Sequence, residues 1–405
     1  MIMNFQKSRN FIFKGILSVQ LMLLIDAVFL IFNLETSQVL SLIRYIFYFF
    51  GVYWIFMGLA ETRQRVALFV NLFLIWNAYI ILAALPELTN PMQNHLVLKQ
   101  FISGKLFISV LPFLICANTD THLFKKIFKL SYYLILLYII FAIPMCYTDM
   151  AFITVGQSEF ITFLIEGAIL MLFTLPYHRR KTITFATVAV VIAIIVMMLL
   201  ARRNKVVFYG GGLSLAIMLN VLKGKLSASK KIVIMLLTIC GIVFVLNSGS
   251  IFKAFFEKMD TGMSSRENVI DDFYSDFNKT PADWIYGRGM FGEFDAGILN
   301  NNDNTGLRDG IENGYLYHIL KGGGIWLGLF ILISLNAMYK GFFRSRNIFV
   351  KGCALFLLLH FLDMVGFGIP VASLKYILVF LSLAGCLSYR WRNFTDEELK
   401  YKLQV

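Results

Sequence analysis

Three basic residues, Arg202, Arg203 and Lys205, lie within four positions of one another between two long apolar segments. Paired guanidinium groups suit the oxygens of a diphosphate, because each planar fork can bind two oxygens at once. A lone carboxylate at the mouth of a cavity, such as that of Glu312, can take a proton from a hydroxyl group as a general base. Together these residue types suit transfer of a group from a diphosphate-activated donor, with the arginines stabilising charge on the leaving diphosphate.

The elements that position these residues are expected to be membrane helices. Of the 405 residues, 58% are hydrophobic and only 15% are charged, and the mean hydropathy is +0.72. Many apolar segments approach or exceed about 18 residues, the length that spans a bilayer. Backbone groups in lipid need partners within their own segment, which favours helices. The chain is therefore interpreted as an all-α polytopic integral membrane protein, with residues 1–405 forming a single membrane domain.

About twelve transmembrane helices are predicted. They cover residues 14–34, 39–60, 66–85, 100–118, 127–147, 160–177, 182–201, 204–222, 232–251, 313–339, 348–368 and 371–390. Lysine and arginine gather in the N-terminal segment, in every second loop and in the C-terminal tail, which places both termini in the cytoplasm. The same rule explains the net charge of +13 without nucleic acid as a partner.

The orientation of Arg202, Arg203 and Lys205 follows from their neighbours. Residues 178–181 and 223–231 are both rich in basic side chains, which predicts that both face the cytoplasm. About forty residues separate them, or about 60 Å of helix, enough for two crossings of the bilayer. The basic cluster is therefore expected at the outer face. It either anchors two helix ends at anionic headgroups or binds an anionic group of a substrate.

Residues 252–312 form a large extracytoplasmic loop between the ninth and tenth predicted helices. Twelve acidic residues against six basic ones leave it a net charge of −6. Ser264 stands three residues before Glu267, a capping-box pattern that predicts the start of a helix. This helix would place four side chains on one face: Ile270, Phe273, Tyr274 and Phe277. The loop is expected to fold down onto the membrane domain.

Ionisable residues in the outer halves of the predicted spans indicate a polar cavity beneath the loop, because charges are unfavourable in lipid and often mark functional cavities. They are Asp26, Arg44, Lys105, Glu166, Asp363 and Lys375. Any one of them could instead belong to a structural ion pair.

The loop ends at "GIENGYLYHILKGGGIWLG", residues 310–328, where Glu312 and Asn313 lead into the tenth helix. His318 lies about one and a half turns further along, either as a substrate contact or as a core histidine. The glycines at 322–324 would let backbones approach closely or let the helix bend.

The chain resembles the Wzy-type polymerases of O-antigen and capsular polysaccharide, which share an architecture with O-antigen ligases. The resemblance covers most of the chain in topology and rests on short, loose motifs. These are an Arg that opens an outer helix, Arg202 or Arg203 of "ARRNKVV"; an early Ser-Arg in the loop, with Arg266 in "SSRENVIDDF"; a Gly-x-Gly after an aromatic in "WIYGRGMFG"; and a pair leading into a Gly-rich helix. That pair is Glu312-Asn313 here instead of His-Asn, which makes Glu312 the candidate base and leaves the role of His318 open.

The resemblance implies a GT-C-like fold and an inverting, metal-independent glycosyltransferase without a cofactor. It would polymerise undecaprenyl-diphosphate-linked repeat units into O-antigen, capsular or exopolysaccharide at the outer face of a bacterial plasma membrane. Arg202, Arg203 and Arg266 would hold diphosphates, and Glu312 would activate the acceptor hydroxyl. The implied partners are the lipid-linked donor and acceptor, membrane lipid and a chain-length regulator protein.

Further substrate contacts are expected from Lys205, Asn313 and His318. Arg288 and Arg308 would orient lipid phosphate or an acidic sugar, or else pair with carboxylates of the loop. An O-antigen ligase, which transfers the same donor glycan to another acceptor, is the nearest alternative. A flippase or transporter for lipid-linked oligosaccharide is the second alternative, although such proteins commonly show internal repeats and helices broken at matching positions, and the sequence shows neither.

Overall fold

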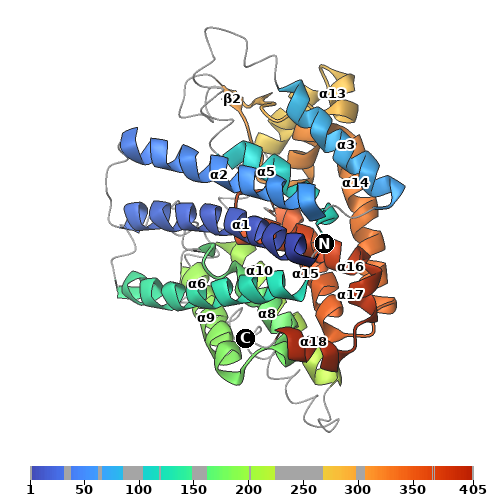
Figure 1. Cartoon of the computed structure of the whole chain (residues 1–405). Coiled ribbons are helices and arrows are strands. Elements are labelled where there is room, and N and C mark those ends of the chain that lie inside the picture. The colour runs from blue at the N-terminus through green and yellow to red at the C-terminus, as the bar shows by residue number, and fades with distance from the viewer. Residues whose placement is uncertain are drawn as a thin grey trace.

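The chain is mostly helical. The computed structural model describes residues 2–31, 38–62, 66–84, 104–117, 120–147, 162–199, 202–223, 268–297, 306–366, 368 and 370–403. Helices make up most of these residues, and two short strands pair with each other (Figure 1). The predicted span 232–251 lies outside the described residues.

The helices before the long polar loop are α1 (Ile2–Ile31), α2 (Gln38–Thr62), α3 (Leu68–Ala83), α5 (Leu106–Val110), η3 (Leu111–Cys116), α6 (Thr121–Tyr147), α8 (Glu166–Phe173), η4 (Leu175–Tyr177), α9 (Arg180–Leu199) and α10 (Arg203–Lys223). The later elements are α13 (Pro281–Tyr286), β1 (Phe294–Asp295), β2 (Leu307–Arg308), α14 (Gly314–Phe343), α15 (Ile348–Gly366), α16 (Leu374–Leu387), α17 (Tyr389–Asn393) and α18 (Asp396–Leu403).

Five helices of the described chain are long and apolar enough to cross a membrane. They contain Asn10–Phe29, Leu42–Ala60, Arg180–Met198, Gly314–Phe343 and Ile348–Gly366. Shorter apolar helices occupy Leu68–Ala83, Leu106–Cys116, Asn204–Leu219 and Leu374–Leu387. The prediction of a helical membrane protein is confirmed, and the number of twelve spans stays a prediction.

Two of the predicted spans are broken. Within the segment predicted at 100–118, the described residues form a short α-helix that tightens to a 3-10 helix at Leu111, next to Pro112. The segment predicted at 160–177 contains α8 and then η4, which includes Pro176. Proline lacks the N–H that an α-helix interior needs, so both breaks have a local cause in the sequence.

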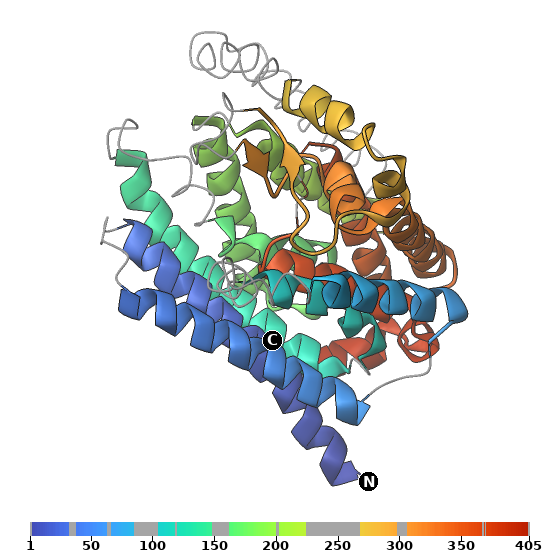
Figure 2. The ribbon, with the colours of Figure 1, turned by 90° about the horizontal axis from the view of Figure 1, so that it is seen from above.

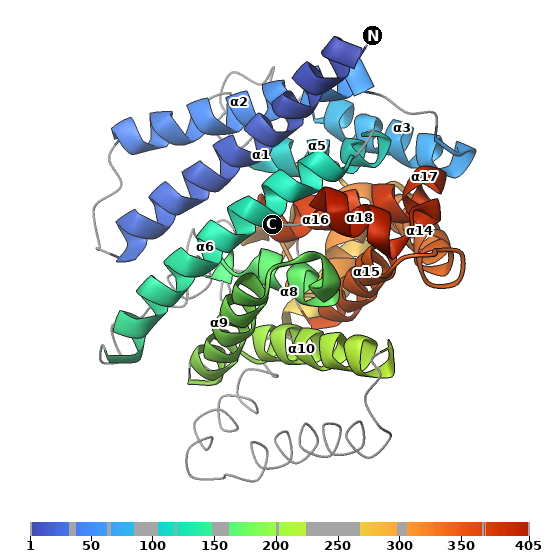
Figure 3. The ribbon, with the colours of Figure 1, turned by 60° about the horizontal axis from the view of Figure 1, so that its bottom comes forward.

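The helices pack in two groups around α8. Figures 1 and 3 show α1, α2 and α6 side by side, and α14, α15 and α16 lie together on another side. Gly15 and Gly51 let α1 and α2 approach closely, since a Cβ on Gly15 would lie 2.7 Å from the Gly51 carbonyl oxygen. Every residue of α8 is buried, so the first residue of α8, Glu166, stands in the middle of the molecule.

The long loop packs onto the helices. Figure 2 shows residues 268–297, in yellow to orange, beside the start of α14. Residues 268–277 are helical, and Phe273 and Phe277 are fully buried against Phe294, Leu316 and Leu320. β1 and β2 pair antiparallel, a small sheet that the sequence did not predict.

The helix predicted in the loop is present, but its buried face is narrower than predicted. Tyr274 is 42% exposed and stacks on Trp284, with ring centroids 5.6 Å apart. The capping residues Ser264 and Glu267 lie outside the described part of the chain.

Candidate functional site

Two segments far apart in the sequence meet at the C-terminal end of α15. The side-chain amide of Asn204 donates to the Gly366 carbonyl at 2.7 Å. The side-chain amide of Asn313 donates to the neighbouring Val365 carbonyl at 3.2 Å. The turn that carries Glu312 and the turn that carries Arg202 are therefore held side by side.

α10 begins at Arg203, at the position where the sequence motif places the start of a helix. Arg202 precedes it and is partly buried, and its backbone N–H donates to the Met197 carbonyl at 2.8 Å. The first free N–H groups of a helix and its dipole favour an anion at this end. The structure places the backbone of Arg203 at the first position of α10 and does not describe its side chain.

α14 begins just after Asn313, whose side chain caps it. The Asn313 Oδ1 atom accepts from the backbone N–H groups of Tyr315 at 3.0 Å and Leu316 at 3.1 Å. Because the amide nitrogen of the same side chain binds Val365, the structure gives Asn313 a positioning role, and the substrate contact expected from it stays a prediction. Glu312 is exposed immediately before this cap, where its carboxylate can be reached from outside.

A cavity of about 430 Å³ lies among α1, α2, α5, α8 and α10 and the start of α16. Of the six ionisable residues predicted to share a cavity, four line it: Asp26, Arg44, Lys105 and Glu166. Lys205 of the basic cluster lines it too. The remaining two, Asp363 and Lys375, form a buried ion pair with each other next to Glu166.

The charges of the cavity are arranged as pairs. Arg44 Nε donates to Asp26 Oδ1 at 2.6 Å. Glu166 is 3% exposed and accepts at 2.9 Å from the backbone N–H of Lys375, in the first turn of α16. Lys205 lies close enough to act on the charge of Glu166. A buried carboxylate needs such partners, because burial without them is strongly unfavourable.

One ion pair ties the loop to the cavity. Lys105 Nζ lies 2.7 Å from Asp309 Oδ2 and 5.7 Å from the centre of the Phe291 ring. Asp309 is three residues before Glu312 in the chain. Partial burial opposes ionisation of Asp309, but the charge and the hydrogen bond of Lys105, together with the charge of Lys321, outweigh it and lower the pKa of that carboxyl. The acidity of the loop was the one feature of the sequence that pointed to such a partner.

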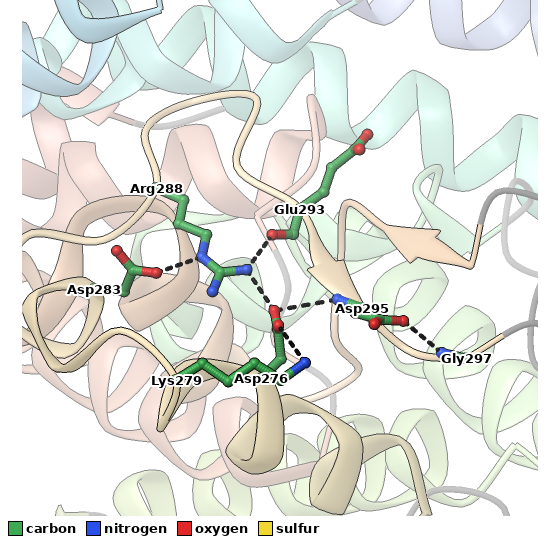
Figure 4. Close-up of polar contacts among 7 residues, drawn as sticks. All are labelled: Asp276, Lys279, Asp283, Arg288, Glu293, Asp295 and Gly297. Carbon is green, nitrogen blue, oxygen red and sulfur yellow. Dashed lines mark hydrogen bonds and ion pairs between the residues drawn. The ribbon is translucent and has the colours of Figure 1, made fainter.

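The side chain of Arg288 is held by partners within the loop (Figure 4). Its guanidinium donates to Asp283 at 2.7 Å, to Asp276 at 2.5 Å and to the Glu293 carbonyl at 2.7 Å. Partial burial would raise the pKa of Asp276, but the hydrogen bond from Arg288 and one from the Asp295 N–H lower it. Of the two interpretations open for Arg288, the structure shows the pairing with loop carboxylates, and a substrate contact stays a prediction.

The other predicted site residues lie in the helix core, in the small sheet of the loop or outside the described residues. His318 is 4% exposed and stacks between Trp326 and Phe330, with ring centroids 4.7 and 5.2 Å away. Its Nδ1 lies 2.6 Å from the Gly314 carbonyl, so it is a core histidine. Arg308 is partly buried in β2, opposite Phe294. Arg266 lies outside the described residues.

The two glycine motifs join the loop to α14. The backbone of α14 breaks at Gly323, which has φ 69° and ψ −178°. The break frees carbonyls of the preceding turn, and the loop binds them: Arg288 N–H donates to Leu320 O at 2.8 Å and Gly289 N–H to Lys321 O at 3.1 Å. Trp76 donates to the next carbonyl, that of Gly322, at 2.8 Å. The segments "GRGMFG" and "KGGG" are thus joined by backbone hydrogen bonds. Their spacing along the sequence did not reveal this contact.

Comparison of the chain with models of protein families, with curated proteins and with solved structures found no match. Within the described residues, no group of three or more His, Cys, Asp or Glu side chains could hold a metal ion. The site combines a helix start that favours an anion, an exposed carboxylate beside it, and a cavity lined by paired charges.

Proposed function

We propose that this chain polymerises undecaprenyl-diphosphate-linked oligosaccharide repeat units at the outer face of a bacterial plasma membrane. The observation that supports this proposal is the junction at the end of α15, where Asn204 and Asn313 bind adjacent carbonyls. It holds the start of α10, with Arg202 and Arg203, beside the turn that presents Glu312. An anion site and a candidate base are thereby adjacent, as group transfer from a diphosphate donor needs.

In the proposed reaction the acceptor sugar hydroxyl attacks the anomeric carbon of the donor sugar. Glu312 takes the hydroxyl proton, the new C–O bond forms on the face opposite the diphosphate, and the old C–O bond breaks with its electron pair going to the diphosphate. Arg202 and Arg203, joined by Arg266 from the loop, stabilise the negative charge that grows on the leaving group. Attack from the opposite face inverts the anomeric configuration, and the arginines serve where a metal would otherwise neutralise charge.

The proposed function requires a particular membrane topology. The chain would have about twelve spans in a GT-C-like arrangement, both termini in the cytoplasm, and the long loop on the outer side. The donor and acceptor are both lipid-linked, and a chain-length regulator protein would bind the same complex. The alternatives of a ligase and a flippase predict different products, so the test below separates them.

The test is the lipid-linked glycan that accumulates when the gene is deleted and when it is restored with variants. Arg203→Ala and Glu312→Gln should each leave the single repeat unit on its lipid and abolish long polymer, with the protein still present in the membrane. Arg180→Ala, at the exposed first position of α9, and Glu397→Gln, at an exposed position of α18, are the matched controls and should keep normal chain lengths.

Each other outcome has a distinct meaning. Full-length chains that stay on the lipid carrier would indicate a ligase. Repeat units trapped at the cytoplasmic side would indicate a flippase. Normal polymer in the Arg203→Ala strain would remove Arg203 from the site, and a wild-type rate with Glu312→Gln would exclude Glu312 as the base.

A further inference from the structure

The cavity beside the junction differs from an anion site because its charges are balanced. Arg44 is paired with Asp26, Lys105 with Asp309, and Lys205 acts on the charge of Glu166. Each of the three cations on the wall therefore has a carboxylate beside it, and two of these carboxylates, Asp26 and Glu166, line the cavity as well. A phosphate or a sugar carboxylate that entered the cavity would meet the negative charges of Asp26 and Glu166 as well as the cations. The balance favours an uncharged ligand.

Adjacent opposite charges suit hydroxyl groups. A hydroxyl can both donate and accept a hydrogen bond, and a guanidinium beside a carboxylate offers a donor and an acceptor side by side. The hydrogen bond of Arg44 to Asp26 uses Nε alone, and its terminal NH₂ groups have no other hydrogen-bond or ion-pair partner among the described residues. The Arg44 side chain is 31% exposed. Two vicinal hydroxyls of a sugar can therefore bind Arg44 and Asp26 together.

The remaining walls suit the body of a sugar. Leu23, Ile108 and Phe163 line the cavity with apolar surface, and Tyr48 adds an aromatic ring whose end lies against Gly104. The C–H faces of a sugar ring pack on such surfaces while its hydroxyls reach the charged pairs. A volume of about 430 Å³ lies within the range of about 300–1,000 Å³ that is usual for small-molecule sites.

The cavity also lies in the right place. Lys205 on its wall is three residues from Arg202, and Asp309, paired to Lys105 on its wall, is three residues from Glu312. A glycan whose diphosphate lay at the start of α10 would reach the cavity with its first sugars. We infer that this cavity binds uncharged, hydroxyl-rich sugar residues of the lipid-linked glycan, an inference that rests on the proposed function.

The experiment measures binding of two probes to the purified full-length chain in detergent micelles. One probe is bare undecaprenyl diphosphate, and the other is the lipid-linked repeat unit extracted from the deletion strain. Wild-type protein should bind the glycolipid at least tenfold more tightly than the bare carrier. The double variant Asp26→Asn/Arg44→Gln keeps a polar side chain at both positions and removes both charges together, so that no unpaired charge is left. It should lose about tenfold or more in glycolipid affinity, the change expected for a lost hydrogen bond to a charged group.

The same variant should bind bare undecaprenyl diphosphate within twofold of wild type, and Lys279→Gln, on the exposed surface of the loop, should bind both probes normally. Equal losses for both probes would overturn the inference, because the cavity would then hold the diphosphate or the lipid tail. Unchanged glycolipid binding by the double variant would also overturn it, as would equal binding of both probes by wild type. Preferential glycolipid binding without any chain extension would refute the polymerase proposal and leave the cavity assignment standing.

Discussion

Replacement of Gly323 by alanine should release the loop from α14. Gly323 has φ 69° and ψ −178°, a region of backbone conformation that is essentially restricted to glycine. A Cβ at this position would lie 2.1 Å from the Ile285 carbonyl oxygen and 2.3 Å from its carbon. Both atoms belong to backbone, so no side-chain rotation can relieve the clash, and the end of α13 must move away.

The magnitude follows from two terms. Forcing alanine into this conformation costs about 1–3 kcal/mol. Moving α13 away stretches the hydrogen bonds from Arg288 N–H to Leu320 O and from Gly289 N–H to Lys321 O, each worth about 1 kcal/mol. The docked loop should therefore lose about 3–5 kcal/mol relative to the released one, a change of at least about a hundredfold in the released population at 1.4 kcal/mol per factor of ten.

Cleavage by trypsin after Arg288 measures this release, because the Arg288 side chain is held by two aspartates when the loop is docked. Mass spectrometry should show much faster cleavage there in Gly323→Ala, while cleavage after the exposed Lys279 serves as the internal reference. Gly328→Ala is the matched control on the same helix, since a Cβ there meets nothing within 4 Å. It should leave the Arg288 site protected. Equal protection in Gly323→Ala would refute the fit between the two glycine motifs.

Three further outcomes are expected. Asn313→Ala should lower the melting temperature, because it removes a helix cap worth about 1 kcal/mol and the contact with Val365, and should shorten the polymer; unchanged stability would show that the cap is not needed. The pKa of Asp276 is lowered below its ordinary 3.8 in the folded chain, so its contribution to loop docking is present above pH 3.8 and should be lost as the pH falls through the lowered pKa. Pepsin cleavage of the loop at a series of acid pH values would detect this loss. The Asp276→Asn variant should abolish that pH dependence. Polymer synthesis in washed membranes should continue after chelator treatment, and activity lost to the chelator and restored by a divalent ion would contradict the metal-independent proposal.

Local signals in the sequence predicted the starts of the two helices that meet at the junction. α10 begins at Arg203, after the turn between two apolar runs, and α14 begins after Asn313, a residue type that caps helices. The cavity followed from a more general argument, since charges that are unfavourable in lipid gather where they find partners. Four of the six residues named on this ground line one cavity, and the other two pair beside it.

The partners of those charges could not be predicted in the same way. Lys105 pairs with Asp309, which is separated from it by more than two hundred residues, and twelve acidic residues of the loop offered equivalent candidates. The burial of His318 in the core depends on Trp326 and Phe330, which lie two to three turns away on the same helix and stack against the imidazole ring. Long-range choices of this kind are set by tertiary packing, which spacing along the chain does not report.

The arrangement of helix ends explains how a balanced cavity can stand beside an anion site. α8, α10, α14 and α16 all begin near the C-terminal end of α15: Asn204 and Asn313 bind its last carbonyls, and Glu166, at the start of α8, accepts from the first turn of α16. The positive ends of four helix dipoles thus face one region. The carboxylate of Glu166 compensates part of this positive potential within the cavity. At the start of α10, the arginines and the first N–H groups of the helix keep the potential positive. Within the proposed function, this division would direct the diphosphate to α10 and leave the paired charges of the cavity to the sugar hydroxyls.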